Sequence, residues 1–139
     1  MNEIPPLLVA ASAAIILLLG SIHLLYTFRG PMLLPRDPEL RTRMQEVSPV
    51  ISRQTTMWKA WVGFNASHSC SAILFGAVYG YLSLAHSAFL FQSTFLLSLG
   101  LLFLLGYVFL AKRYWFRTPL LGILLATFLY ALALIVSWV

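Results

Sequence analysis

The chain has 139 residues, of which 60% are hydrophobic and 9% are charged, and its formal net charge is +5. A soluble domain carries about 25% charged residues because its surface faces water, so this composition excludes an ordinary soluble protein. The Lys and Arg residues lie mainly between long hydrophobic stretches, which indicates membrane topology and not a basic surface for nucleic acid. The single cysteine, Cys70, excludes an intrachain disulfide and a cysteine-ligated metal site within one chain.

Four hydrophobic stretches are long enough to cross a bilayer, and they cover residues 6–28, 58–84, 89–111 and 119–139. About 20 helical residues cross ~30 Å of hydrocarbon, and the backbone polar groups of such a segment must be paired within a helix. The sequence therefore predicts an all-α fold, a four-helix transmembrane bundle that forms a single domain over residues 1–139. The start of the chain lacks the basic residues of a signal peptide, so we expect the first span to be retained.

The connection between the first two spans is the only long one, and it contains a signal for a further helix. Asp37 and Pro38 are typical of a helix start. The apolar residues that follow at helical spacing are Leu40, Met44 and Val47. This pattern predicts a short amphipathic helix at the membrane interface, in the first cytoplasmic loop. A second helix start is predicted at residues 48–49, from which a helix would run unbroken into the second span. Another start is predicted at Thr118 and Pro119 for the fourth span.

The distribution of cationic residues predicts the orientation. The first connection and its flanks hold Arg29, Arg36, Arg41, Arg43, Arg53 and Lys59, and the last connection holds Lys112, Arg113 and Arg117. The connection at residues 83–88 holds no Lys or Arg. Because Lys- and Arg-rich loops stay in the cytoplasm, we expect a multi-pass protein with both termini on the non-cytoplasmic side. Aromatic residues near the span ends predict interfacial belts. The inner belt consists of Trp58, Trp61, Tyr114 and Trp115, and the outer belt of Tyr79, Tyr81 and Trp138.

Small residues at helical spacing predict where the spans pack together. Helices in lipid associate through close packing, which small side chains permit. The stripe on the second span consists of Asn65, Ser69, Ala72, Gly76 and Gly80, and that on the fourth of Gly122, Ala126, Ala133 and Ser137. Ser12 and Gly20 are the small residues noted on the first span. These stripes predict helix–helix contacts within one chain, and the same motif could serve a homo-oligomer.

His23, Asn65 and His68 lie deep inside the predicted spans and should face the bundle. His23 is about 9 Å from the cytoplasmic end of the first span, whereas Asn65 and His68 are about 10 and 15 Å from that end of the second. Such groups are costly in lipid, so they are expected to find partners within the protein. We therefore predict a polar layer, or ligand-binding layer, formed by His23, Asn65 and His68 together with Ser69. His86 lies in the outer turn, where water can solvate it.

Several segments resemble a family of small bacterial four-transmembrane-helix proteins with a Gly-Phe-Asn-x-Ser-His segment and no assigned activity. The resemblance is carried by Gly63-Phe64-Asn65, Ser67-His68-Ser69, Gly20-Ser21-Ile22-His23 and residues 113–119. It would cover most of the chain. It implies the four-helix fold and a bacterial source, and hence the bacterial inner membrane, but it implies no chemistry.

Four functions fit the polar layer. The first, which we favour, is a non-catalytic binding, scaffold or accessory subunit in which the layer holds the helices in register. The second is a binding site for a lipid, a quinone or another hydrophobic ligand. The third is a redox protein with haem b between His23 and His68, whereas the first two need no cofactor. The fourth is an enzyme with a histidine base, which is disfavoured because the spans contain no Asp or Glu to orient it.

The expected partners follow from the charge and the hydrophobicity. Membrane lipid is the first, and anionic head groups could contact the arginines next to the span ends, which are Arg41, Arg43, Arg113 and Arg117. Topology alone also explains these charges. A homo-oligomer or a larger membrane complex remains open, and no nucleic acid is expected.

Overall fold

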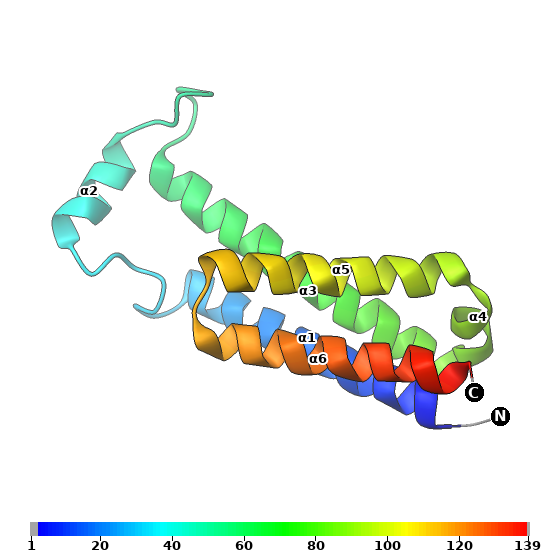
Figure 1. The fold of residues 1–139 in the computed structure, drawn as a ribbon. Helices are drawn as coiled ribbons and strands as arrows, with labels where there is room; N and C mark the ends of the chain where they lie inside the picture. The colour runs from blue at the N-terminus through cyan, green and yellow to red at the C-terminus, as the bar shows by residue number, and fades with distance from the viewer. Residues whose placement is uncertain (1–2, 139) are drawn as a thin grey trace. The chain divides into compact units, whose positions relative to one another are not determined.

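The described part of the chain, residues 3–138 of a computed structural model, consists of six α-helices without β-strands (Figure 1). Four of the helices are long and apolar enough to cross a membrane. These are α1 (Ile4–Phe28), α3 (Met57–Ala85), α5 (Thr94–Tyr114) and α6 (Arg117–Ser137). The two short helices are α2 (Pro38–Glu46) and α4 (Ser87–Gln92). The predicted all-α fold with four membrane-capable helices is therefore confirmed.

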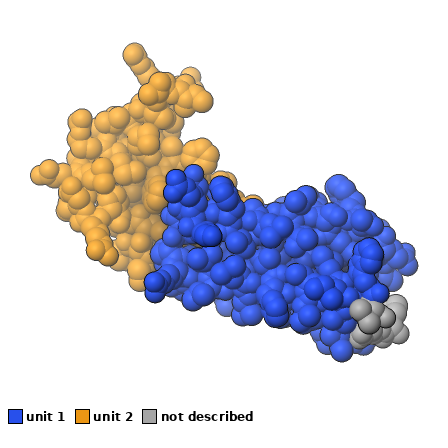
Figure 2. Space-filling model, viewed as in Figure 1, with its two compact units in different colours: residues 1–19, 72–139 blue, residues 20–71 orange. Residues whose placement is uncertain are grey.

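The chain divides into two compact units, which Figure 2 shows in different colours. We call residues 1–19 and 72–139 the bundle unit, and residues 20–71 the loop unit. Helices α1 and α3 each contribute one segment to each unit, so both units contain membrane-capable helix. The single domain over residues 1–139 stays a prediction.

The bundle unit has a hydrophobic core to which all four long helices contribute. The core side chains are Val9, Ala13, Ile16, Ala72, Phe75, Tyr79, Leu90, Leu104, Ala111, Ile123, Ala126, Tyr130 and Ala133. Large apolar side chains also lie on the outside of this unit, where Phe95, Phe109 and Phe128 are 73%, 65% and 62% exposed. Such an exterior is unfavourable in water and favourable in lipid. Apolar side chains thus occupy both the core and the exterior of the bundle unit, as expected for a bundle that lies in a bilayer.

Small residues allow the helices of the bundle unit to approach one another, as their spacing predicts. A Cβ atom on Gly76 would lie 2.7 Å from the carbonyl oxygen of Ala13 and 2.8 Å from the backbone nitrogen of Leu17. A Cβ on Gly122 would lie 2.9 Å from the Leu19 side chain. All three distances are too short for a real Cβ atom, so α3 and α6 pack on α1 where they carry no side chain. The packing role predicted for Gly76 and Gly122 is confirmed.

Two buried tyrosines fasten α5 to its neighbours. The hydroxyl of Tyr79 donates to the carbonyl oxygen of Leu96 at 2.7 Å, and that of Tyr130 donates to the carbonyl oxygen of Leu97 at 3.1 Å. Gly100 lies next to both rings, and a Cβ there would overlap them. Tyr79 is 6% exposed, so its predicted place in the outer aromatic belt is wrong. It lies on the same face of α3 as Ala72 and Phe75, which turns its ring into the core.

The third span differs from its predicted start at residue 89. Residues 87–92 form the separate helix α4, and α5 begins only at Thr94. The Ser93 hydroxyl accepts the backbone N–H of Leu96 at 3.2 Å, which caps α5 at its first turn. Hydrophobicity alone did not reveal this break, because both sides of it are apolar.

Two further helix starts also need correction. The predicted start at residues 48–49 is wrong, because residues 47–56 form turns and α3 begins at Met57. The N–H of Met57 donates to the carbonyl oxygen of Val47 at 2.8 Å, which closes this segment onto the start of α3. The fourth span begins at Arg117 with Phe116 as its N-cap, so Thr118 lies inside its first turn. By contrast, the start of α2 is as predicted, since Asp37 accepts the N–H of Glu39 at 2.9 Å.

Candidate functional site

The loop unit brings the predicted polar residues of α1 and α3 into contact. Nε2 of His23 lies 2.9 Å from Oδ1 of Asn65, although the two residues are 42 positions apart in the chain. The rings of His23 and His68 meet edge to face, with centroids 5.4 Å apart and planes at 90°. All three side chains are partly buried. His23, Asn65 and His68 therefore form one cluster, which we call the polar layer.

The hydrogen bonds of Asn65 determine which nitrogen of His23 carries a proton. Nδ2 of Asn65 donates to the backbone carbonyl of Trp61 at 2.8 Å, so Oδ1 is the atom that faces His23. An amide oxygen accepts only, and therefore Nε2 of His23 must donate. In the neutral imidazole, Nδ1 is then an acceptor. Within residues 3–138 no hydrogen bond to this Nδ1 atom is found, so its lone pair is available to accept a hydrogen bond from a hydroxyl group.

Hydroxyl groups next to the polar layer satisfy the helix backbone and do not enter the layer. Ser69 is fully buried and donates to the carbonyl oxygen of Asn65 at 2.9 Å. Thr27 donates in the same way to the carbonyl oxygen of His23 at 2.8 Å. Such bonds to the carbonyl one turn earlier are a usual way to satisfy a hydroxyl within a helix. The structure thus places Ser69 beside the layer as a support.

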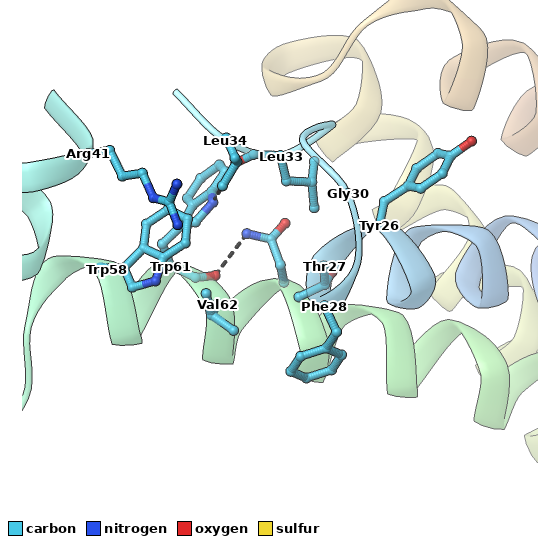
Figure 3. A pocket seen from close by; sticks show the side chains of 11 residues that line it. Tyr26, Thr27, Phe28, Gly30, Leu33, Leu34, Arg41, Trp58, Trp61 and Val62 are labelled. Atoms are coloured by element: carbon cyan, nitrogen blue, oxygen red, sulfur yellow. Dashed lines mark hydrogen bonds between the residues drawn. The ribbon is translucent and has the colours of Figure 1, made fainter. Parts of the chain in front are cut away.

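A cavity of about 180 Å³ adjoins the polar layer in the loop unit (Figure 3). Its lining comes from the end of α1, the connection after it, α2 and the first turns of α3. The lining residues are Tyr26, Thr27, Phe28, Gly30, Leu33, Leu34, Arg41, Trp58, Trp61, Val62 and Asn65. Asn65 belongs to both the cavity and the polar layer, so a molecule in the cavity lies next to the layer. The walls combine apolar side chains with exposed polar atoms, a mixture that suits an amphiphilic ligand.

Two tryptophans of α3 hold the connection that closes this cavity. The indole N–H of Trp61 donates to the carbonyl oxygen of Leu33 at 3.2 Å. The guanidinium of Arg41 lies over the ring of Trp58, 5.4 Å from its centroid (Figure 3). The positions of these tryptophans near a span end predict an interfacial belt and do not indicate the cavity. Their spacing of three residues on one helix face was the available signal.

The other arginines predicted to contact head groups have different surroundings. Arg43 forms an exposed ion pair with Glu46 at 3.3 Å and does not line the cavity. In the bundle unit, the guanidinium of Arg113 lies 5.9 Å from the ring centroid of Tyr114, and Arg117 is the first residue of α6. Of the four predicted arginines, only Arg41 lines the cavity.

The polar layer does not present two free imidazole nitrogens to one iron. In a bis-histidine haem the porphyrin lies between the two imidazoles. Here the rings of His23 and His68 contact each other directly, and Asn65 engages Nε2 of His23. Haem binding between these two histidines would require the rings to separate. The described residues also contain no group of three His, Cys, Asp or Glu side chains that could hold a metal ion.

Comparison with protein families, with curated proteins and with solved structures finds no match to this chain. The resemblance to small bacterial four-span proteins therefore stays a prediction. Function must be argued from the polar layer and the cavity themselves.

Proposed function

We propose that this chain is a non-catalytic binding protein of the bacterial inner membrane that holds a hydrophobic ligand, a lipid or a quinol, at the polar layer. The observation that carries the proposal is the hydrogen bond between His23 and Asn65, which leaves Nδ1 of His23 as an acceptor, while Asn65 itself also lines the adjoining cavity. A ligand with a hydroxyl group and an apolar body is complementary to that arrangement. A purely structural layer would not need the adjoining cavity.

The ligand proposal is tested by analysis of what the purified protein retains. The wild type in mild detergent should yield one lipid or quinone species in organic extracts, at about one molecule per chain by mass spectrometry. His23→Ala should lose it because the acceptor is gone, and His68→Ala should lose it because the ring no longer supports His23. His86→Ala is the control, since the His86 side chain hydrogen-bonds to the exposed Tyr81 hydroxyl at 3.0 Å and does not belong to the polar layer.

Three outcomes would contradict the proposal. The first is a wild type that carries no such molecule. The second is a His23→Ala variant that retains as much of it as the wild type. The third is a Soret band in the purified protein, which would favour the haem b alternative, because only a bound porphyrin absorbs there.

We further propose that both termini lie on the non-cytoplasmic side. Four spans return the chain to the side on which it began, and the Lys- and Arg-rich connections favour the cytoplasm. Alkaline phosphatase fused to the C-terminus should then be active, and green fluorescent protein fused after Trp115 should fluoresce. The opposite pair of results would reverse the orientation.

A further inference from the structure

The cavity of the loop unit has a single charged group and no acid to neutralise it. Arg41 is the only charged side chain among its lining residues. Within residues 3–138 Arg41 forms no ion pair, whereas Arg43 on the same helix is paired with Glu46. An arginine without a carboxylate partner is available to an anion, and its guanidinium forms charge-assisted hydrogen bonds with phosphate.

Trp58 holds the guanidinium of Arg41 in a position that suits anion binding. The guanidinium carbon lies 5.4 Å from the Trp58 ring centroid, which is within the range of a cation–π contact. A cation–π contact does not need the N–H donors as hydrogen bonds, so they stay available for oxygen atoms. A phosphate oxygen pair matches that planar set of donors.

The size of the cavity limits which part of a ligand it can hold. Sites that enclose a drug-sized molecule measure about 300–1,000 Å³. At about 180 Å³ the cavity is smaller, so it suits a head group and not a complete lipid. Its apolar side chains, among them Leu33, Leu34 and Val62, would cover the carbon atoms next to the head group.

The cavity lies at the ends of two membrane-capable helices, where lipid phosphates are expected. It is formed where α1 ends at Phe28 and where α3 begins at Met57. The ends of spanning helices lie at the boundary between hydrocarbon and water, and tryptophan is enriched there. An amphiphile could therefore place its phosphate at Arg41 while its chains stay in the bilayer.

We infer that this cavity binds the phosphate group of an anionic amphiphile, with Arg41 as its charge partner and Trp58 as the support for Arg41. The site goes beyond the proposed hydroxyl acceptor at His23, although Asn65 is common to both. Inorganic phosphate carries the same recognition group, so the test must separate a lipid phosphate from a soluble one.

The test is a native mass spectrometry titration of the whole protein in detergent with phosphatidylglycerol or phosphatidylcholine. The wild type should bind phosphatidylglycerol in preference to phosphatidylcholine. Arg41→Gln should bind it about tenfold more weakly, since a charge-assisted hydrogen bond is lost. Arg43→Gln is the matched control on the same helix and should bind as the wild type does. Arg41→Lys should recover part of the affinity, because it restores the charge but not the planar donors.

A second arm adds inorganic phosphate to the wild type. Unchanged phosphatidylglycerol binding supports a lipid phosphate, whereas displacement at millimolar phosphate supports the same site with a soluble source. The inference is overturned if the wild type shows neither the lipid preference nor phosphate binding, or if Arg41→Gln binds like the wild type. His23→Ala should keep the lipid preference, so failure of the hydroxyl site and failure of this site are distinguishable.

Discussion

Segments of α1 and α3 belong to both the bundle unit and the loop unit, but different interactions stabilise the interior of each unit. Every buried hydrophobic side chain of the described chain lies in the bundle unit, whereas the buried residues of the loop unit are Gly20 and Ser69. The loop unit is instead joined by polar contacts, such as those of Asn65 and Trp61. The comparison indicates that one unit supplies stability and the other supplies a site that can adapt to a ligand.

The difference arises within the single helix α3. Its first part, residues 57–71, carries an amide, a histidine and several serines, whereas residues 72–85 carry Phe75, Gly76 and Tyr79 on the core face. Apolar and small residues permit close packing, and polar residues in lipid seek hydrogen bonds. One continuous helix can therefore belong to a packed bundle at one end and to a binding site at the other.

The largest effect on the bundle unit should come from Gly76→Ala. Its Cβ would meet the backbone of α1, which cannot move aside as a side chain can. We expect the free energy of unfolding to fall by about 3 kcal/mol, at the upper end of overpacking costs. Equilibrium unfolding in detergent with increasing dodecyl sulfate measures it. Gly63→Ala is the control in the loop unit, where a Cβ would have nothing within 4 Å. Equal losses in both variants would remove the distinction between the units.

Gly100→Ala should destabilise the bundle unit somewhat less. The added Cβ would overlap the rings of Tyr130 and Tyr79, which are side chains and can shift slightly within the core. The expected loss is about 2 kcal/mol in the same unfolding experiment. Gly106→Ala on the same helix has open space around its Cβ and should leave the transition unchanged. An unaltered Gly100→Ala protein would mean that the tyrosine contacts with α5 are not tight.

Tyr130→Phe should cost about 1 kcal/mol, because the hydrogen bond to the Leu97 carbonyl is lost while the ring packing remains. The thermal transition in detergent, followed by circular dichroism, should move to lower temperature. Tyr114→Phe is the exposed control, since Tyr114 is 70% exposed. If both substitutions shift the transition equally, the buried hydroxyl has no special role.

Asn65→Ala should have the smallest effect on stability and the largest on ligand retention. Hydrogen bonds between membrane helices average about 0.6 kcal/mol, so the unfolding transition should move little. His23 would lose the partner that fixes its donor and acceptor nitrogens, so the bound lipid or quinol should be lost from organic extracts. A loss of stability as great as that of Gly76→Ala would show that the polar layer supports the fold and does not serve binding.

Much of the fold could be predicted because hydrophobic length requires spanning helices. The first and second spans agree with α1 and α3 within two residues at each end. The predicted start of the third span disagrees with the start of α5 at Thr94, because the helix break at Ser93 depends on a single side-chain cap within an apolar stretch. Burial of Tyr79 was also missed, since a tyrosine near a helix end suits an interfacial belt as well as a core.

The polar layer was more predictable than the cavity beside it. His23 and Asn65 lie at similar depths on neighbouring antiparallel spans, and this similarity predicts that their side chains meet. The cavity depends instead on the path of residues 29–56, which is largely irregular and is held by contacts such as Trp61 to Leu33 and Arg41 to Trp58. Those contacts join residues that are far apart in the sequence, and no repeating pattern of residue types predicts them.

The sequence by itself determined that this chain has four helices suited to a bilayer, because a long apolar segment without charge has no other stable environment for its side chains and backbone. It also determined that a histidine and asparagine layer would lie within them, because the cost of burying those groups in lipid requires partners. Only the tertiary structure decided that Nδ1 of His23 is the open acceptor and that Arg41 lines a cavity while Arg43 does not. Those details depend on hydrogen-bond direction and on the fold of the connecting loop, which residue type and spacing do not specify.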